Sequence, residues 1–269
     1  MNIKLNQKRA GLTMKKDNSL LPSILLVEKN TRAIGEPKCG LLNTVTSACQ
    51  IRFHTMENSA VLDIPHDWRG IIMMNRVNMD IVAGEAVYQE LPLFALVKLQ
   101  VFIDESRGLA LKYEQQQPWQ TVQLSTDPQV ERNADVERWL LSLHHSQPDE
   151  MSALADFLRR TEYYWLISFL LNGSTNSEKL QDLGMRYGLS YSHFRRLCRN
   201  ALGNSAKNEM RGWRIARALL DAVEERQSLT EVAMRHGYAS SSHLSNDIRD
   251  VFGVSPRGIW NIIEKKSQI

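Results

Sequence analysis

Three arginines occur close together in the C-terminal half of the chain, at Arg195, Arg196 and Arg199. On a helix that turns by about 100° per residue, with Ser192 at 0°, they fall at about 300°, 40° and 340°, so the four side chains share one face. The opposite face is apolar and consists of Phe194, Leu197, Cys198 and Ala201. A guanidinium group is a planar fork that can bond O6 and N7 of guanine together or clamp a phosphate. The pattern predicts a helix, about Tyr191–Leu202, that presents arginines to DNA; a solvated charged face is the alternative.

A second stretch about 50 residues later has a similar arrangement. A helix is predicted over about Ser241–Phe252, and Ser242, Ser245, Asn246 and Arg249 take the matching angles on it. Serine and asparagine can bond phosphates or bases, and asparagine can read adenine with two hydrogen bonds. With a single arginine, this helix is expected to make fewer or weaker base contacts, and a purely structural role is the alternative.

These two helices belong to an internal repeat. Met185-Arg-Tyr-Gly188 recurs as Met234-Arg-His-Gly237, and Ala201-Leu-Gly203-Asn-Ser205 recurs as Val251-Phe-Gly253-Val-Ser255. Each copy predicts a helix, a turn that contains glycine, and a second helix, which is the sequence form of a helix-turn-helix. A capping box, Ser228-Leu-Thr-Glu231, opens the first helix of the second copy.

The segments around the repeat are also predicted to be helical. Lys207–Ala222 has apolar residues at helical spacing, and a rigid helix here would hold two reading helices about 34 Å apart, one turn of DNA. Ser255-Pro256 opens a final helix, in which Trp260 and Ile263 are expected to pack back onto the second copy.

Charge is spread unevenly along the 269 residues. From Leu158 onward there are 17 Lys and Arg against 11 Asp and Glu, whereas the part before it has 16 against 19. A basic C-terminal part favours a polyanion partner, although charge alone also fits RNA or a membrane surface. The length allows one large domain or two ordinary ones.

The N-terminal half is predicted to be rich in strands, followed by helices, so the fold class is α+β. Short runs with β-branched residues, bounded by turn residues, predict strands at Ile24–Val27, Gln50–His54, Ala60–Ile64, Gly70–Met74, Ile81–Tyr88, Leu93–Ile103 and Leu109–Tyr113. A helix is predicted over Asp127–His145, then a break, and then one long helix from Asp149 to Leu171 whose core includes Trp165. The expected domains are 1–147, for regulation or partner binding, and 148–269, for DNA.

Three cysteines, Cys39, Cys49 and Cys198, give an odd count that argues against a disulfide framework and for the cytoplasm. No apolar run approaches the roughly 18 residues of a membrane span, and Ser19–Val27 is short for a signal peptide. The chain has no phosphate loop, nucleophile elbow or metal-ligand spacing, so we expect no enzyme, cofactor or metal. Methyl acceptance by Cys39 or Cys49 is the enzymatic alternative, and a basic face that binds an acidic protein is the non-enzymatic one.

The repeat resembles the AraC/XylS family of bacterial transcription regulators. The resemblance covers about Glu162–Ile263 and is carried by Gly188-Leu-Ser190, Phe194-Arg-Arg-Leu197, Gly203-Asn-Ser205, Trp213-Arg-Ile215, Val232-Ala233, Gly237-Tyr238 and Phe252-Gly-Val-Ser-Pro256. It implies that the two second helices enter successive major grooves. The base-contacting roles then fall on Ser192, Arg195 and Arg196, and on Ser241, Ser242, Ser245 and Asn246.

Within that family, Ser190-Tyr-Ser-His-Phe-Arg-Arg-Leu-Cys198 and Arg211-Gly-Trp-Arg214 are similar to the invasion-type branch. This likeness implies an activator of type III secretion and virulence genes, with RNA polymerase as a partner and a secretion chaperone as coactivator. A small molecule bound by the N-terminal half is the alternative effector, and a homodimer stays open.

Several positions depart from the family pattern. Gly184 replaces an alanine, which predicts a more flexible first helix. Lys179 stands where a Ser or Thr cap is common, which leaves capping to Thr175, Asn176 or Ser177. Asp247 and Ile248 replace an apolar residue and a phenylalanine. These changes predict a weaker second DNA contact.

Overall fold

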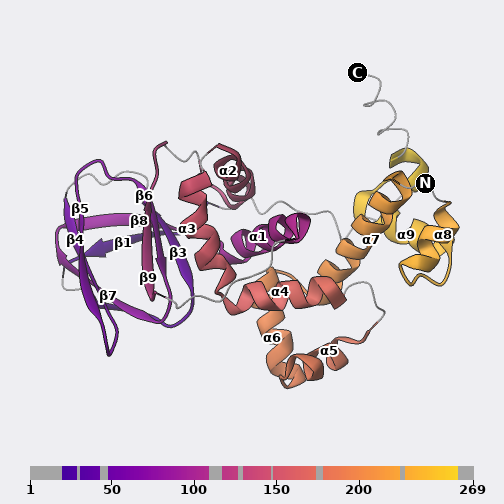
Figure 1. The fold of residues 1–269 in the computed structure, drawn as a ribbon, viewed down its shortest axis with the longest axis horizontal. Helices are drawn as coiled ribbons and strands as arrows, with labels where there is room; N and C mark the ends of the chain where they lie inside the picture. Colours follow the sequence, from indigo (N-terminus) through magenta and orange to yellow (C-terminus); the bar gives the residue numbers. More distant parts are fainter. Residues whose placement is uncertain are drawn as a thin grey trace, which may run out of the picture. The chain divides into compact units, whose positions relative to one another are not determined.

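The computed structural model describes residues 20–28, 31–42, 48–108, 117–126, 130–146, 148–173, 178–224 and 228–259. The chain forms two compact bodies (Figure 1). Among the described residues, the N-terminal body comprises those up to Ile167 together with 200–203, and the C-terminal body comprises the others from Ser168 onward. The predicted α+β class is confirmed, because strands dominate the first part and helices the second. The domain boundary at 147/148 concerns independent folding and stays a prediction.

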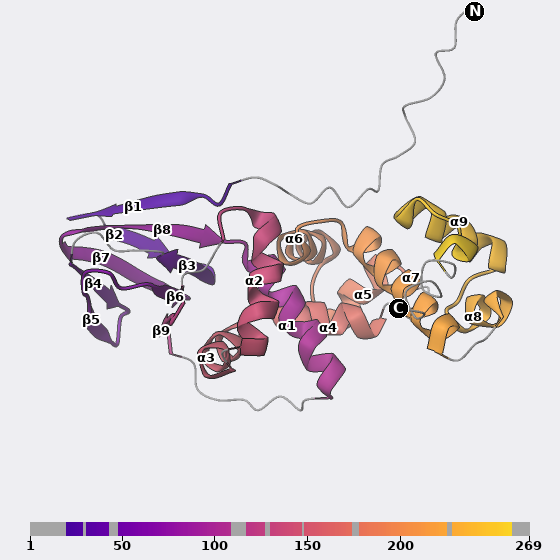
Figure 2. The ribbon, with the colours of Figure 1, turned by 90° about the horizontal axis from the view of Figure 1, so that it is seen from above.

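The described part of the N-terminal body contains two antiparallel sheets (Figure 2). One has the order β1-β8-β3-β6-β9 and the other β2-β7-β4-β5. The strands are β1 Ser23–Val27, β2 Thr31–Ile34, β3 Lys38–Leu42, β4 Cys49–His54, β5 Ser59–Ile64, β6 Gly70–Met74, β7 Val77–Ala83, β8 Glu85–Leu91 and β9 Trp119–Gln123.

Alternating side chains of both sheets form one apolar core. In β4 the pattern is strict, with Cys49, Ile51 and Phe53 buried and the residues between them exposed or partly so. Phe53 stacks on Trp119 of β9 with ring centroids 5.7 Å apart. The two sheets therefore cover each other, as the period of two along a strand requires.

One predicted strand is wrong because it crosses a turn. Ile81–Tyr88 contains the end of β7 and the start of β8, which meet at Gly84 with φ of +74°. A Cβ at Gly84 would lie 2.5 Å from the carbonyl oxygen of Ala48, so glycine is required by space as well as by backbone angle. Strands β2, β3 and β9 were not predicted, and Leu109–Tyr113 lies outside the described residues.

The predicted strand Leu93–Ile103 is instead part of helix α1, Leu93–Arg107. Its buried face recurs at helical spacing and includes Leu93, Leu96 and Val97, but also Gln100 and Asp104. Two buried polar residues on that face hide the helical period, because sequence periodicity counts them as solvent-facing. Helix α2, Asn133–Ser146, confirms most of the helix predicted over Asp127–His145.

The single helix predicted from Asp149 to Leu171 is in fact two, α3 Pro148–Arg159 and α4 Glu162–Gly173. Thr161 divides them: its hydroxyl donates to the Leu158 carbonyl at 2.7 Å and accepts from the Tyr164 N–H at 3.2 Å. This is an N-cap, which starts a new helix. Trp165, predicted as core, is 42% exposed.

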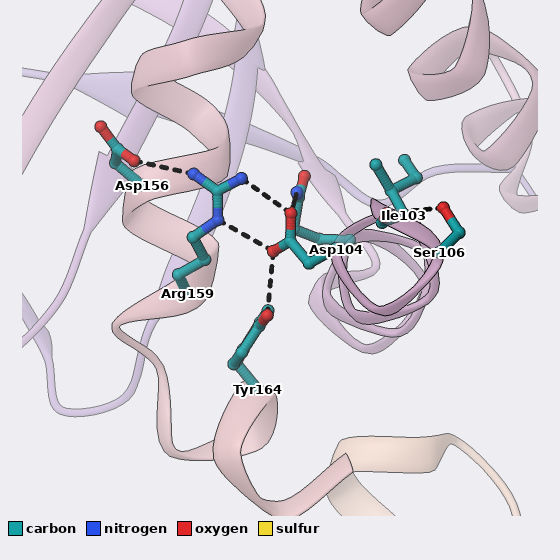
Figure 3. Close-up of polar contacts among 7 residues, drawn as sticks. Ile103, Asp104, Ser106, Asp156, Arg159 and Tyr164 are labelled. Carbon is teal, nitrogen blue, oxygen red and sulfur yellow. Dashed lines mark hydrogen bonds and ion pairs between the residues drawn. The ribbon is translucent and has the colours of Figure 1, made fainter. Parts of the chain in front are cut away.

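A buried carboxylate, Asp104, ties α1, α3 and α4 together. It is 2% exposed and accepts two bonds of 2.8 Å from Arg159, one of 2.9 Å from the Tyr164 hydroxyl and one of 3.0 Å from Gln100. Figure 3 shows Arg159 and Tyr164 converging on it, with Asp156 on the far side of the guanidinium. Burial raises the pKa of Asp104, but the bonds from Arg159 and Tyr164 outweigh burial and leave the pKa below its usual value.

All the regular elements in the described part of the C-terminal body are helices, and they confirm the predicted repeat. Its further helices are α5 Leu180–Tyr187, α6 Tyr191–Leu202, α7 Ala206–Glu224, α8 Leu229–Arg235 and α9 Ser241–Phe252. Helix α7 includes the predicted linker Lys207–Ala222 and is longer at both ends. A last helical turn follows at 256–259, and Trp260 and Ile263 lie outside the described residues.

Candidate nucleic-acid interface

The first helix-turn-helix consists of α5 and α6, joined by a glycine turn. Gly188 has φ of +85°, and its N–H donates to the Met185 carbonyl at 3.1 Å. The next residue, Leu189, donates to the Gly184 carbonyl at 3.0 Å. Together these bonds close α5 with the left-handed glycine ending that helices favour, and α6 begins three residues later at Tyr191.

Gly184 has a packing role that the sequence did not reveal. It is buried in α5, and a Cβ there would lie 3.3 Å from the side chain of Phe194 in α6. Glycine at this position therefore lets the two helices approach closely, because a side chain here would crowd Phe194. The flexibility expected of this helix stays a prediction. Lys179 precedes α5 and makes no side-chain cap, and the suggested caps Thr175, Asn176 and Ser177 lie outside the described residues.

Helix α6 has the two faces that its sequence predicts. Its inner face is buried and consists of Phe194, Leu197, Cys198 and Ala201. Ser192, Arg195, Arg196 and Arg199 are all exposed. Among the residues that the structure describes, none of the three guanidinium groups forms an ion pair. The positive charge of this face is therefore available to a partner.

Aromatic packing anchors α6 from behind. Tyr187 of α5 lies between Phe169 of α4 and Phe194 of α6, with ring centroids 5.1 and 5.6 Å away. Arg186 covers the Phe169 ring at 5.0 Å, a cation–π contact. Burial raises the pKa of the Cys198 thiol to about 12, which keeps it neutral within this core. The exposed arginines thus stand on a helix whose rotation is fixed by packing.

The second helix-turn-helix consists of α8 and α9. The predicted capping box is confirmed: the Ser228 hydroxyl accepts from the Glu231 N–H at 3.3 Å, and the Glu231 carboxylate accepts from the Ser228 N–H at 3.0 Å. Gly237 turns the chain with φ of +70°. The Ser240 hydroxyl then caps α9 by accepting from the His243 N–H at 3.1 Å.

Helix α9 also has a buried and an exposed side. Leu244 and Ile248 are fully buried, so isoleucine fills the core position where the family has phenylalanine. Ser242, Asn246 and Arg249 are exposed. The other two predicted contact residues, Ser241 and Ser245, are half-buried, and the Ser245 hydroxyl donates at 2.7 Å to the Ser241 carbonyl. The exposed trio is therefore the part of α9 best placed to meet a partner.

Helix α7 connects the two copies, packs on the second and is bonded to α4. Ile215, Ala218 and Ala222 share a core with α8 and α9. Arg217 donates at 2.9 Å to the Leu171 carbonyl near the end of α4, where a cation opposes the negative end of the helix dipole. One helical turn further along α7, Asp221 contacts His236 of the second glycine turn at 2.8 Å.

Sequence reasoning missed one residue of this interface. Arg211, on α7, bonds the side chains of Asp247 and Asp250 on α9. In the sequence, Asp247 is visible only as a departure from the expected pattern. The tertiary structure shows that its partner is Arg211.

Over the described ranges, no group of three or more His, Cys, Asp or Glu residues could hold a metal ion. No helix within those ranges is both long enough and apolar enough to span a bilayer.

Comparison of the sequence with known proteins gives a matching family and relatives. Residues 183–259 match the family described as helix-turn-helix domain. The invasion protein InvF of Salmonella typhimurium is 38% identical over 183 residues, which are 68% of this chain and 85% of InvF. The transcriptional regulator MxiE of Shigella flexneri is 36% identical over 129 residues, 47% of this chain and 61% of MxiE. Among solved structures, ToxT from Vibrio cholerae aligns with 88% of this chain and 97% of its own at 10% identity and a TM-score of 0.36. The chain belongs to the AraC/XylS family of DNA-binding transcription regulators.

Proposed function

We propose that this protein activates invasion or type III secretion genes by binding promoter DNA through α6 and α9. The observation that carries the proposal is the exposed face of α6, where three guanidinium groups without ion-pair partners among the described residues stand on a packed helix. The identity to a protein named for invasion and to a transcriptional regulator supports the choice of target genes.

In this proposal, Ser192, Arg195, Arg196 and Arg199 of α6 enter one major groove. Ser242, Asn246 and Arg249 of α9 enter the next, with Ser241 and Ser245 as secondary contacts at its edge. Arginine forks read guanine or clamp phosphate, and the Asn246 amide reads adenine. Because α6 carries more positive charge, it is expected to dominate affinity, and α9 to add specificity.

The test replaces Arg195 and Arg196 with alanine in the full chain. Each arginine that bonds a base should contribute about 1–3 kcal/mol and set the preference at one base pair. The matched control is Arg138→Ala on α2, whose side chain is 75% exposed and far from α6 in sequence. Genome-wide footprinting of the two variants and the wild type gives the readout. Unchanged sites and affinity for the double variant would remove α6 from the interface.

For the N-terminal body we propose a protein coactivator of the secretion-chaperone kind. Large apolar side chains with almost no exposure occupy the space between the two sheets, including Leu42, Phe53 and Met74. Such filling leaves the outer surfaces for recognition, which suits a protein better than a sugar-like effector. Footprinting with and without candidate chaperones separates the two effectors, since a small molecule would act with no chaperone present.

Three further parts of the proposal have direct tests. A protein that binds promoters would act in the cytoplasm together with RNA polymerase. In vitro transcription with purified polymerase tests this partner. Residues 148–269 are proposed to bind DNA alone without responding to the coactivator, and an isolated fragment that fails to bind would refute that separation. Sedimentation of the free chain and of its DNA complex decides between monomer and homodimer.

A further inference from the structure

The two copies of the repeat differ in carboxylates. Helix α6 carries no acidic residue, whereas α9 carries Asp247 and Asp250. These aspartates occupy the repeat positions that Leu197 and Asn200 hold in α6. A carboxylate on a helix that approaches DNA is repelled by the phosphates, so its place on the helix matters.

Both aspartates lie beside the exposed face of α9. At about 100° per residue, with Ser242 at 0°, Asn246 falls at about 40°, Asp250 at about 80° and Asp247 at about 140°. Asp250 is thus the immediate neighbour of Asn246, with 64% of its side chain exposed, whereas Asp247 turns inward with 14% exposed. The pair forms the edge of the face that is proposed to read DNA.

One guanidinium group bonds both carboxylates. Nη2 of Arg211 donates to Oδ1 of Asp247 and, at 3.0 Å, to Oδ2 of Asp250, and the arginine side chain is 26% exposed. Behind this cluster, Tyr238 is 4% exposed and lies under Arg214 with the guanidinium carbon 5.9 Å from the ring. Because Arg211 belongs to α7 and the aspartates to α9, the cluster fixes how α9 is rotated on the linker helix.

We infer that Arg211 is a positioning residue for DNA recognition by α9: it holds Asp247 and Asp250 to α7, neutralises part of their charge, and so turns Asn246 and its neighbours toward the groove. This inference rests on the proposed function. It also gives a physical reason for the aspartate at 247, because its carboxylate forms an ion pair with Arg211 where an apolar residue would pack in the core. The tether adds to the apolar core of Leu244 and Ile248 in holding α9 on α7.

The test uses the full chain and a duplex of about 30 base pairs, selected from a randomised library by the wild-type protein, which is long enough for two major grooves. Arg211→Gln releases Asp247, Asp250 and α9 from α7, so α9 should lose the phosphate contact of Arg249. With a salt slope of about 0.9 per phosphate charge, the loss of affinity should be about eightfold larger at 0.1 M KCl than at 1 M. Hydroxyl-radical protection should be lost in the groove assigned to α9 and kept in the groove assigned to α6.

The charge-exchanged variant, Arg211→Asp with Asp247→Arg, restores an ion pair across the same two helices and should recover protection in the α9 groove. Retained protection of both grooves by Arg211→Gln overturns the inference. Equal loss in both grooves, with a lower melting temperature, overturns it too, because the role is then general folding. Failure of the exchanged variant to recover the α9 groove likewise counts against the tether. If the wild type selects no duplex at all, the proposed function fails as well, so the two failures are distinguishable.

Discussion

Replacing Asp104 with asparagine tests the reasoning about the N-terminal body most sharply. The carboxylate accepts four hydrogen bonds, two of them from Arg159. Asparagine keeps the size but has one acceptor oxygen, and its amide group faces N–H donors. About two bonds to a charged acceptor are lost, each worth about 1.5–3 kcal/mol.

The expected cost lies at the low end, about 3 kcal/mol, because Arg159 can relax. Its side chain is 26% exposed, and it keeps a bond of 3.0 Å to Asp156. Broken buried pairs typically cost about 3–5 kcal/mol, which agrees with this figure. For a chain of this size the melting temperature should fall by about 6–12 °C.

Asp156→Asn is the matched control, because Asp156 binds the same guanidinium but is 45% exposed. An exposed pair of this kind contributes about 0.2–1 kcal/mol. Urea denaturation of the full chain, followed by circular dichroism, measures both variants. If Asp104→Asn cost no more than Asp156→Asn, the structural role assigned to the buried carboxylate would be refuted.

The difference in stability between the wild type and Asp104→Asn should also depend on pH. The pKa of Asp104 is lower in the folded chain than in the unfolded one, so its contribution to stability is complete above the unfolded value of about 3.9. The contribution is lost as the pH falls through the lower, folded pKa. The difference in unfolding free energy between the wild type and Asp104→Asn should therefore be constant from pH 6 to 8 and shrink below about pH 4. A difference that grew on acidification would contradict the sign of the shift.

Three further predictions concern single groups. Tyr164→Phe removes one donor to the buried carboxylate and should lower the unfolding free energy by about 1.5 kcal/mol, measured by urea denaturation; no change would mean that the hydroxyl bond contributes nothing. Burial raises the thiol pKa of Cys39, Cys49 and Cys198, so iodoacetamide at pH 8 should leave all three unlabelled until the chain is unfolded, and mass spectrometry after brief labelling checks this. Ser228→Ala removes the cap of α8 and should cost about 1 kcal/mol, with Ser228→Gly costing only a few tenths, a ranking that thermal melts can reverse or support.

The helices of the repeat show how much local sequence can determine. The bounds of α6 and α9, the glycine turn at Gly188 and the capping box at Ser228 all follow from residues within about a dozen positions of one another. Apolar periodicity, a cap and a left-handed glycine each act over one or two helical turns. The exposed arginine face of the candidate interface was therefore predictable in full.

The N-terminal body shows the limit of that reasoning. Strand β1 pairs with β8, so that Ser23 faces Gln89, and no local pattern encodes a partner at that separation. Helix α1 was predicted as a strand from the composition of Leu93–Ile103, yet the fold buries the polar Gln100 and Asp104 on one face of a helix. It satisfies the carboxylate with Arg159, which comes 55 residues later. Burial of a polar group depends on a partner that sequence periodicity does not reveal.

The sequence by itself thus determined two helix-turn-helix copies, their caps and the arginine face of the first, because these features depend on contacts within a few turns of helix. Tertiary structure alone decided the sheet order, the buried Asp104 cluster and the tether of α9 to α7. Arg211 and Asp247 are separated by 36 residues, and each by itself looks like an ordinary surface charge. They form an ion pair beside the exposed face of α9 only because the fold brings the two charges together.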